Sequence, residues 1–101
     1  MNPLSSIEIS HAALLHNAKL FRKKLTPSTN LIAVVKGNAY GHGQNEIVKI
    51  LEPHVDAFQV DDMDELVRLR KVSHKRTLVL GYIAKNEIAE GLRLKAEIAV
   101  Y

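Results

Sequence analysis

The expected architecture follows from one segment, Leu31-Ile-Ala-Val-Val-Lys36-Gly-Asn-Ala-Tyr40-Gly-His-Gly43. Its first five residues are apolar and include two adjacent valines, which is typical of a strand buried on both faces in a parallel sheet. A lysine follows at the strand end, where burial would disfavour its charged form. Glycines that tolerate positive φ and a tyrosine hydroxyl come next, so the loop is suited to holding an anion.

A ten-residue motif in this segment resembles a known cofactor-attachment sequence. Residues 34–43, Val-Val-Lys-Gly-Asn-Ala-Tyr-Gly-His-Gly, are similar to the pyridoxal-phosphate attachment motif of the alanine racemase family. The resemblance implies that Lys36 is the Schiff-base lysine of an enzyme that uses pyridoxal 5'-phosphate. One position departs from the usual form, because Gly37 stands where alanine is common. This change leaves the lysine chemistry in place and loosens the backbone.

Composition indicates a soluble globular chain that is one ordinary domain or part of a larger one. It has 101 residues, of which 47% are hydrophobic and 25% are charged. It contains no cysteine, which excludes disulfides and thiol chemistry. The first residues lack the pattern of a secretory signal, and no apolar run approaches the length of a membrane span. We therefore expect a cytoplasmic protein without a membrane partner.

The charge pattern argues against a nucleic acid partner. The formal net charge is +3, and lysines and arginines are interleaved with acidic residues. The two compact basic clusters, Arg22-Lys23-Lys24 and His74-Lys75-Arg76, have no aromatic residues between their charges. We interpret both clusters as solvated surface.

Hydrophobic periodicity predicts strands that alternate with helices. A short strand at 7–9 precedes a helix that Ser10 would cap and that carries an apolar stripe of Leu14, Ala18, Phe21 and Leu25. The other predicted elements, in order, are a strand at 31–35, a helix at 44–51, a strand at 56–60, a helix capped by Asp61 or Asp62 and running to about 72, a strand at 77–82, a helix at 86–92 capped by Asn86, and a strand at 96–101. This order implies right-handed crossovers into a parallel α/β sheet, either open or closed into a barrel.

The family resemblance favours the barrel. Asp56-Ala57-Phe58, Asp64-Glu65-Leu66, Leu69-Arg70 and Leu78-Val79-Leu80-Gly81 are similar to successive barrel units of the family. This implies that residues 1–101 are a partial N-terminal domain of a TIM-type (β/α)8 barrel. Four parallel strands cannot close a barrel that normally needs about eight. Residues 1–10 would be a lead-in strand that pairs with a C-terminal β domain.

Three residues are the candidate site. The first is Lys36. A lysine at the carboxyl end of a barrel strand lies on the usual active-site side, and an apolar environment favours the neutral amine that acts as a nucleophile. The resemblance further implies that the Tyr40 hydroxyl binds the cofactor phosphate and that Leu80 lines the cofactor ring, although plain barrel core is an equal interpretation of Leu80. We interpret His42 as structural and Asn38 as a residue that shapes the loop.

No metal site is predicted. The remaining histidines show no ligand spacing, because His11 and His16 are five residues apart and do not share one helical face. The acidic run of Asp61, Asp62, Asp64 and Glu65 is typical of helix capping and dipole compensation.

The resemblance implies an isomerase that interconverts L- and D-alanine, the D-alanine serving as a peptidoglycan precursor. Lys36 would be one of two bases, and the opposite base would be a tyrosine from the second subunit of a homodimer, outside residues 1–101. We therefore expect this chain alone to be inactive. Two alternatives stay open: a racemase of the same family acting on serine, lysine or a broader set, and a non-catalytic cofactor-binding fragment.

Overall fold

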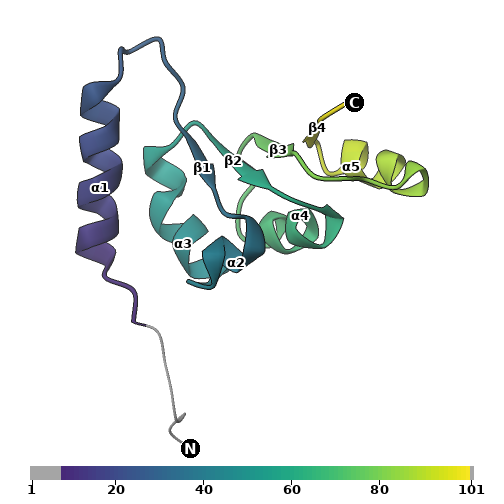
Figure 1. Cartoon of the computed structure of the whole chain (residues 1–101), viewed down its shortest axis with the longest axis horizontal. Helices are drawn as coiled ribbons and strands as arrows, with labels where there is room; N and C mark the ends of the chain where they lie inside the picture. Colours follow the sequence, from purple (N-terminus) through teal and green to yellow (C-terminus); the bar gives the residue numbers. More distant parts are fainter. Residues whose placement is uncertain (1–7, 101) are drawn as a thin grey trace, which may run out of the picture.

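The computed structural model describes residues 8–100, in which parallel strands alternate with helices (Figure 1). The sheet has the order β1-β2-β3-β4, and each strand is parallel to its neighbour. The strand bounds are β1 (Ile32–Val34), β2 (Ala57–Val60), β3 (Thr77–Val79) and β4 (Glu97–Ile98). The predicted parallel α/β architecture is therefore confirmed.

The helices begin close to the predicted positions, with one exception. The Ser10 hydroxyl accepts from the Ala13 N–H at 3.1 Å, and Asp62 accepts from the Glu65 N–H at 2.9 Å, so both predicted caps form. Asn86 does not cap a helix, because it lies inside a 3₁₀ turn. The bounds are α1 (His11–Lys24), α2 (Lys36–Tyr40), α3 (Gln44–Leu51), η1 (Glu52–His54), α4 (Met63–Arg70), η2 (Lys85–Glu87) and α5 (Ile88–Arg93), where η marks a 3₁₀ turn.

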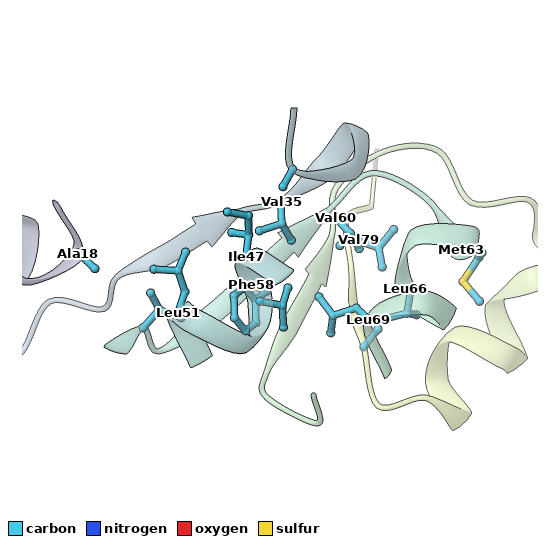
Figure 2. Packing of buried hydrophobic residues seen from close by; sticks show 14 residues of the cluster. Ala18, Val35, Ile47, Leu51, Phe58, Val60, Met63, Leu66, Leu69 and Val79 are labelled. Atoms are coloured by element: carbon cyan, nitrogen blue, oxygen red, sulfur yellow. The ribbon is translucent and has the colours of Figure 1, made fainter. Parts of the chain in front are cut away.

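The hydrophobic core lies between one face of the sheet and helices α3 and α4 (Figure 2). Phe58, Val60 and Val79 point from the strands toward the helices and are fully buried. The helices contribute residues at helical spacing to the same cluster. These residues are Ile47, Val48 and Leu51 from α3 and Met63, Leu66 and Leu69 from α4.

The opposite face of the sheet is not covered, which contradicts the prediction that the first strand is buried on both faces. Ile32 is 47% exposed and Val34 is 39% exposed, whereas Val35 at the strand end is buried. Helices cover only one face of a barrel strand, and side chains of the other strands cover the second face when the barrel closes.

The predicted apolar stripe of α1 is partly wrong, because Phe21 is exposed.

The first basic cluster does not lie wholly in solvent. Arg22 donates to the Asp56 carboxylate at 2.6 Å, and the Leu31 N–H donates to the same oxygen at 2.6 Å. The bond from Leu31, followed by the bond from Arg22, lowers the pKa of Asp56 below its ordinary value. Arg22 thus joins the end of α1 to the starts of β1 and β2, and the interpretation as solvated surface is wrong for this residue.

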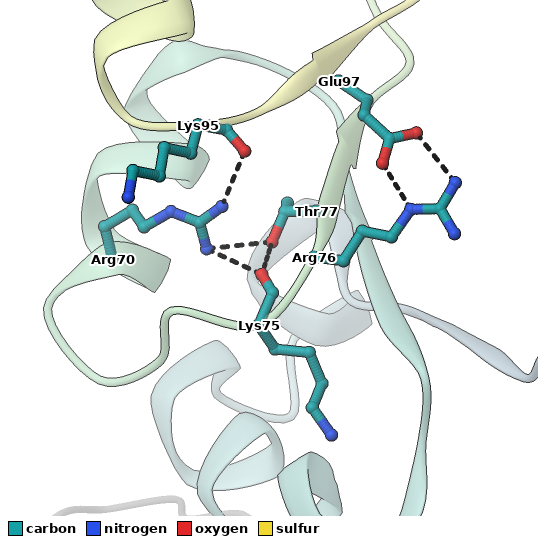
Figure 3. Close-up of polar contacts among 6 residues, drawn as sticks. All are labelled: Arg70, Lys75, Arg76, Thr77, Lys95 and Glu97. Carbon is teal, nitrogen blue, oxygen red and sulfur yellow. Dashed lines mark hydrogen bonds and ion pairs between the residues drawn. The ribbon is translucent and has the colours of Figure 1, made fainter.

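The second basic cluster also makes structural contacts. The half-buried Lys75 donates from Nζ to the main-chain carbonyls of Glu52 and Val55, so the solvated interpretation is wrong here too. Arg76 pairs with Glu97 across the start of β3 and β4 (Figure 3). Because both partners of this ion pair are exposed, the pair adds little to the stability of the fold.

Arg70 joins three segments at the amino end of the sheet (Figure 3). Its guanidinium donates to the Lys75 carbonyl at 2.9 Å, the Thr77 hydroxyl at 3.0 Å and the Leu94 carbonyl at 2.8 Å. Burial lowers the pKa of Arg70, but an arginine side chain keeps its charge in proteins. The side chain therefore connects the end of α4 to β3 and to the segment before β4.

The predicted lead-in strand falls mostly outside the described residues. Ile7 is outside them, and Glu8 and Ile9 belong to no strand. Among residues 8–100, no helix has the length and apolar character needed to cross a bilayer.

We predict that Arg70→Lys lowers the free energy of unfolding by about 1–3 kcal/mol, because a lysine lacks the planar fork and leaves part-buried acceptors without a donor. Denaturant unfolding at neutral pH measures the change. Arg68→Lys, on the exposed side of the same helix, is the control and should stay within about 0.5 kcal/mol of the unchanged protein. Equal effects of the two substitutions would contradict the bridging role.

Candidate functional site

Lys36 lies where β1 ends, at the carboxyl edge of the sheet. The preceding residue, Val35, is buried and its N–H donates to the Gln59 carbonyl at 2.9 Å, so the sheet bonding continues to the residue before the lysine. Within residues 8–100 the Lys36 amine makes no hydrogen bond and no ion pair. The amine is therefore available to an added group.

The strand register relates Lys36 to Leu80. Val34 pairs with Gln59, and Gln59 pairs with Leu78. Continuing the register by two residues brings Lys36, Asp61 and Leu80 to the same carboxyl edge of the sheet, although Val35 (φ −120°, ψ 20°) has left the extended geometry in which side chains alternate between faces. Leu80 is 42% exposed at this edge.

The segment after Lys36 is a left-handed helical turn and not an irregular loop. Positive φ occurs at Gly37, as the glycine pattern predicts, and also at Asn38 (56°), Ala39 (57°) and Tyr40 (57°). Left-handed helical geometry costs roughly 1–2 kcal/mol for each residue that carries a Cβ. Contacts with the rest of the fold must therefore hold the turn in place.

Tyr40 ends this turn with its side chain 65% exposed. Its hydroxyl therefore remains accessible to an anionic group beside the carboxyl edge. His42, which we interpreted as structural, is also exposed. The structure thus brings Lys36 and Tyr40 together in one short turn, and Leu80 stands at the same edge of the sheet.

Glu65 holds the turn, and sequence reasoning missed this role. Its carboxylate accepts from the Gly37 N–H at 2.6 Å and from the Asp61 N–H at 2.8 Å. The Asp62-x-x-Glu65 spacing looks like a capping box, in which the glutamate would bond the Asp62 N–H. The helix-capping interpretation is correct for Asp62 but incomplete for Glu65, which joins the ends of β1 and β2. The sequence signal for this role was the Asp62-x-x-Glu65 spacing just after the strand β2.

A second pair of polar contacts supports the turn from α3. The Asn38 side-chain oxygen accepts from the Gln44 N–H at 2.9 Å, consistent with the predicted loop-shaping role. The Gln44 side chain is buried and donates to the Glu65 carbonyl at 3.0 Å. The turn, α3 and α4 are therefore linked by hydrogen bonds between side chains and the main chain.

Gly81 allows the close approach of β2 and β3 beside this site. A Cβ at this position would lie 2.1 Å from the Asp61 carbonyl oxygen, which is main chain and cannot rotate away. A Cβ at Gly37, in contrast, would have no atom within 4 Å. Lack of space for a methyl group therefore does not explain why glycine stands at position 37 in place of alanine.

The donor set fits pyridoxal phosphate. An available amine suits the aldehyde, an accessible phenol hydroxyl suits the phosphate, and an apolar side chain at the same edge suits the ring. A metal site has no comparable support in the part of the chain that the structure describes, where no three His, Asp or Glu side chains cluster in a way that could hold an ion.

The fold and this edge define the chain as a section of a parallel α/β barrel with its candidate site at the carboxyl ends of the strands. The family model "Alanine racemase, N-terminal domain" matches residues 9–101. The chain therefore belongs to the alanine racemase family, and it covers the N-terminal part of the TIM-type barrel. Enzymes of this family depend on pyridoxal phosphate.

Relatives and solved structures agree with this assignment. The serine/alanine racemase of Enterococcus gallinarum is 44% identical over 85 residues, which are 82% of this chain and 12% of that protein. The alanine racemase of Streptococcus uberis is 38% identical over 89 residues, 87% of this chain and 24% of that protein. The crystal structure of alanine racemase from E. faecalis has a TM-score of 0.87 at 28% identity and covers 91% of this chain and 25% of that chain. The chain thus spans about a quarter or less of the length of these proteins.

We predict that Gly81→Ala lowers the free energy of unfolding by about 1–3 kcal/mol, because the added methyl group must push Asp61 away from β3. The control Gly37→Ala has open space and should cost only the difference in left-handed backbone preference, about 1 kcal/mol. Denaturant unfolding of both variants measures the two effects. A Gly81→Ala protein as stable as the unchanged protein would contradict the close approach.

Proposed function

We propose that the protein is a pyridoxal-phosphate-dependent racemase that interconverts L- and D-alanine, and that Lys36 holds the cofactor. The observation that carries this proposal is the position of Lys36, directly after a buried strand end and within a motif that resembles the family's attachment sequence. The match of the family model over residues 9–101 supports it. Supply of D-alanine for peptidoglycan, in the cytoplasm, is the corresponding biological role.

Each candidate residue has a distinct task in this proposal. The Lys36 amine binds the cofactor aldehyde and afterwards takes or returns a proton at the substrate Cα from one face. The Tyr40 hydroxyl donates a hydrogen bond to the phosphate, and Leu80 packs on the cofactor ring and keeps water away from it. When bound, pyridoxal phosphate supplies an electron sink for the negative charge at Cα.

The rest of the machinery is proposed to lie outside this chain. Racemisation needs a base on the opposite face of Cα, and by resemblance this is a tyrosine of the second subunit in a homodimer. Residues 1–10 are proposed to pair with a β domain.

Serine is a second candidate substrate. The relative from Enterococcus gallinarum, at 44% identity, is named a serine/alanine racemase. The ratio of kcat/KM values for serine and alanine in the natural protein distinguishes the two substrates. Covalent cofactor binding without racemisation of any amino acid would instead support the non-catalytic alternative.

We predict that Lys36→Ala abolishes the covalent attachment of pyridoxal phosphate and lowers racemase activity by about 10²- to 10⁴-fold or more, because both the attachment point and one base are lost. Borohydride reduction followed by peptide mass mapping locates the attachment, and deuterium exchange at the alanine Cα measures proton transfer. Lys49→Ala, an exposed lysine on α3, is the matched control and should keep both properties. A Lys36→Ala protein that still carries a reducible adduct would refute the assignment.

We predict that Tyr40→Phe raises the dissociation constant for pyridoxal phosphate about 10- to 100-fold, because a hydrogen bond to a charged group contributes about 1.5–3 kcal/mol. An absorbance titration of the cofactor measures the constant. The exposed Tyr82, which also follows a strand end, provides the control substitution Tyr82→Phe, expected to change binding less than about twofold. Unchanged affinity in Tyr40→Phe would remove the phosphate role from this hydroxyl.

A further inference from the structure

The Glu65 carboxylate is buried without a cationic partner. The residue is 6% exposed, and within residues 8–100 no lysine, arginine or histidine side chain pairs with it. Its charge is instead met by the main-chain N–H groups of Gly37 and Asp61 and by the first turn of α4. Burial of a charge for two main-chain bonds is unusual, since glutamate is rarely buried unpaired. The arrangement therefore calls for a role at the segment it contacts.

The two bonds closest to Lys36 fix both peptide planes that flank it. On one side the Val35 carbonyl, which belongs to the peptide between Val35 and Lys36, accepts from the Ala39 N–H at 2.9 Å. On the other side the Gly37 N–H donates to Glu65 at 2.6 Å. Since φ and ψ of Lys36 lie between these bonds, the direction of its Cα–Cβ bond is set by them.

The Gly37 bond also sits at the first residue of the left-handed turn. Turn residues with a Cβ are strained, so without a partner for the Gly37 N–H the peptide after Lys36 could rotate toward a more common conformation. Gln44 joins the same arrangement, because it donates to the Glu65 carbonyl and to the Asn38 side chain. Glu65 is therefore the point at which the support of the turn converges.

We propose that Glu65 is a positioning residue for Lys36: its carboxylate, through the Gly37 N–H, holds the main chain so that the lysine amine is directed to the carboxyl edge of the sheet. This inference rests on the proposed function, in which that amine captures pyridoxal phosphate. Because the amine already has the direction needed for reaction, it reaches a reactive geometry sooner, and the capture of pyridoxal phosphate is faster.

The test compares Glu65→Gln with Asp64→Asn in the natural protein. In Glu65→Gln the side chain keeps one acceptor oxygen and turns an NH₂ donor toward one of the two main-chain N–H groups. Asp64→Asn is the control, because it removes the same charge from an exposed residue on the same helical turn. Two quantities are measured: amide hydrogen exchange at Gly37 and Asp61 without cofactor, and the rate at which added pyridoxal phosphate becomes reducible by borohydride at Lys36.

We expect Glu65→Gln to accelerate exchange at Gly37 or Asp61 by about tenfold or more, without a comparable change at the core residue Phe58. The capture rate at Lys36 should fall about tenfold or more, while Asp64→Asn stays within about twofold for both quantities. A purely structural role would lower stability everywhere and would not separate these amides from the core.

Each other outcome overturns a defined statement. Faster exchange with an unchanged capture rate overturns the positioning role and leaves the proposed function intact. Absence of any adduct at Lys36 in the unchanged protein overturns the proposed function, while the exchange data still report on the bond between the Gly37 N–H and Glu65. If Glu65→Gln does not fold, amide exchange in the unchanged protein tests the bond between the Gly37 N–H and Glu65. A protected Gly37 amide supports this bond, and a Gly37 amide that exchanges at the rate of an unstructured chain overturns it.

Discussion

The buried carboxylate of Glu65 joins the carboxyl ends of the first two strands through main-chain N–H groups. Side-chain packing holds the strands against α3 and α4, and in the turn that follows Lys36 it includes Ala39. The left-handed geometry of that turn is unfavourable for residues with a Cβ. A charged acceptor at its first N–H offsets part of this cost, and the turn conformation depends on that bond.

The two ends of the sheet are stabilised by different interactions. At the amino end, Arg22 and Arg70 bridge helices to strand starts through ionic and carbonyl contacts. At the carboxyl end, Lys36 and Tyr40 keep polar groups available to solvent. This division matches the general behaviour of parallel α/β barrels, in which one end contributes stability and the other contains the chemistry.

The uncovered face of the sheet links the fold to the proposed function. Ile32 and Val34 line the face that a closed barrel fills with side chains from its other strands, and Lys36 and Leu80 follow at the carboxyl edge of the sheet. A cofactor bound there would meet an amine and a hydroxyl from one short turn and the apolar side chain of Leu80, the residue after β3. Convergence of these three groups follows from the parallel register, since the strand ends lie at one edge.

Much of the architecture could be predicted from local sequence patterns. Alternating apolar runs and caps such as Ser10 and Asp62 depend on neighbours within a few residues, so the strands, most helices and their parallel order followed from them. The ten-residue motif around Lys36 likewise identified the candidate site and the family. Asn86 failed as a cap because the chain forms a 3₁₀ turn there.

Only the tertiary structure decided which charged residues are structural. Lys75 and Arg22 looked like solvated cations and instead bind groups 20 or more positions away, as Glu65 does with Gly37 at a separation of 28. The same holds for the exposure of Val34, which depends on what covers the sheet. Sequence determined most of the elements and pointed to the proposed role of Lys36, because these follow from adjacent residues. The fold determined how that lysine is held, because its support comes from a helix that is distant in the chain and adjacent in space.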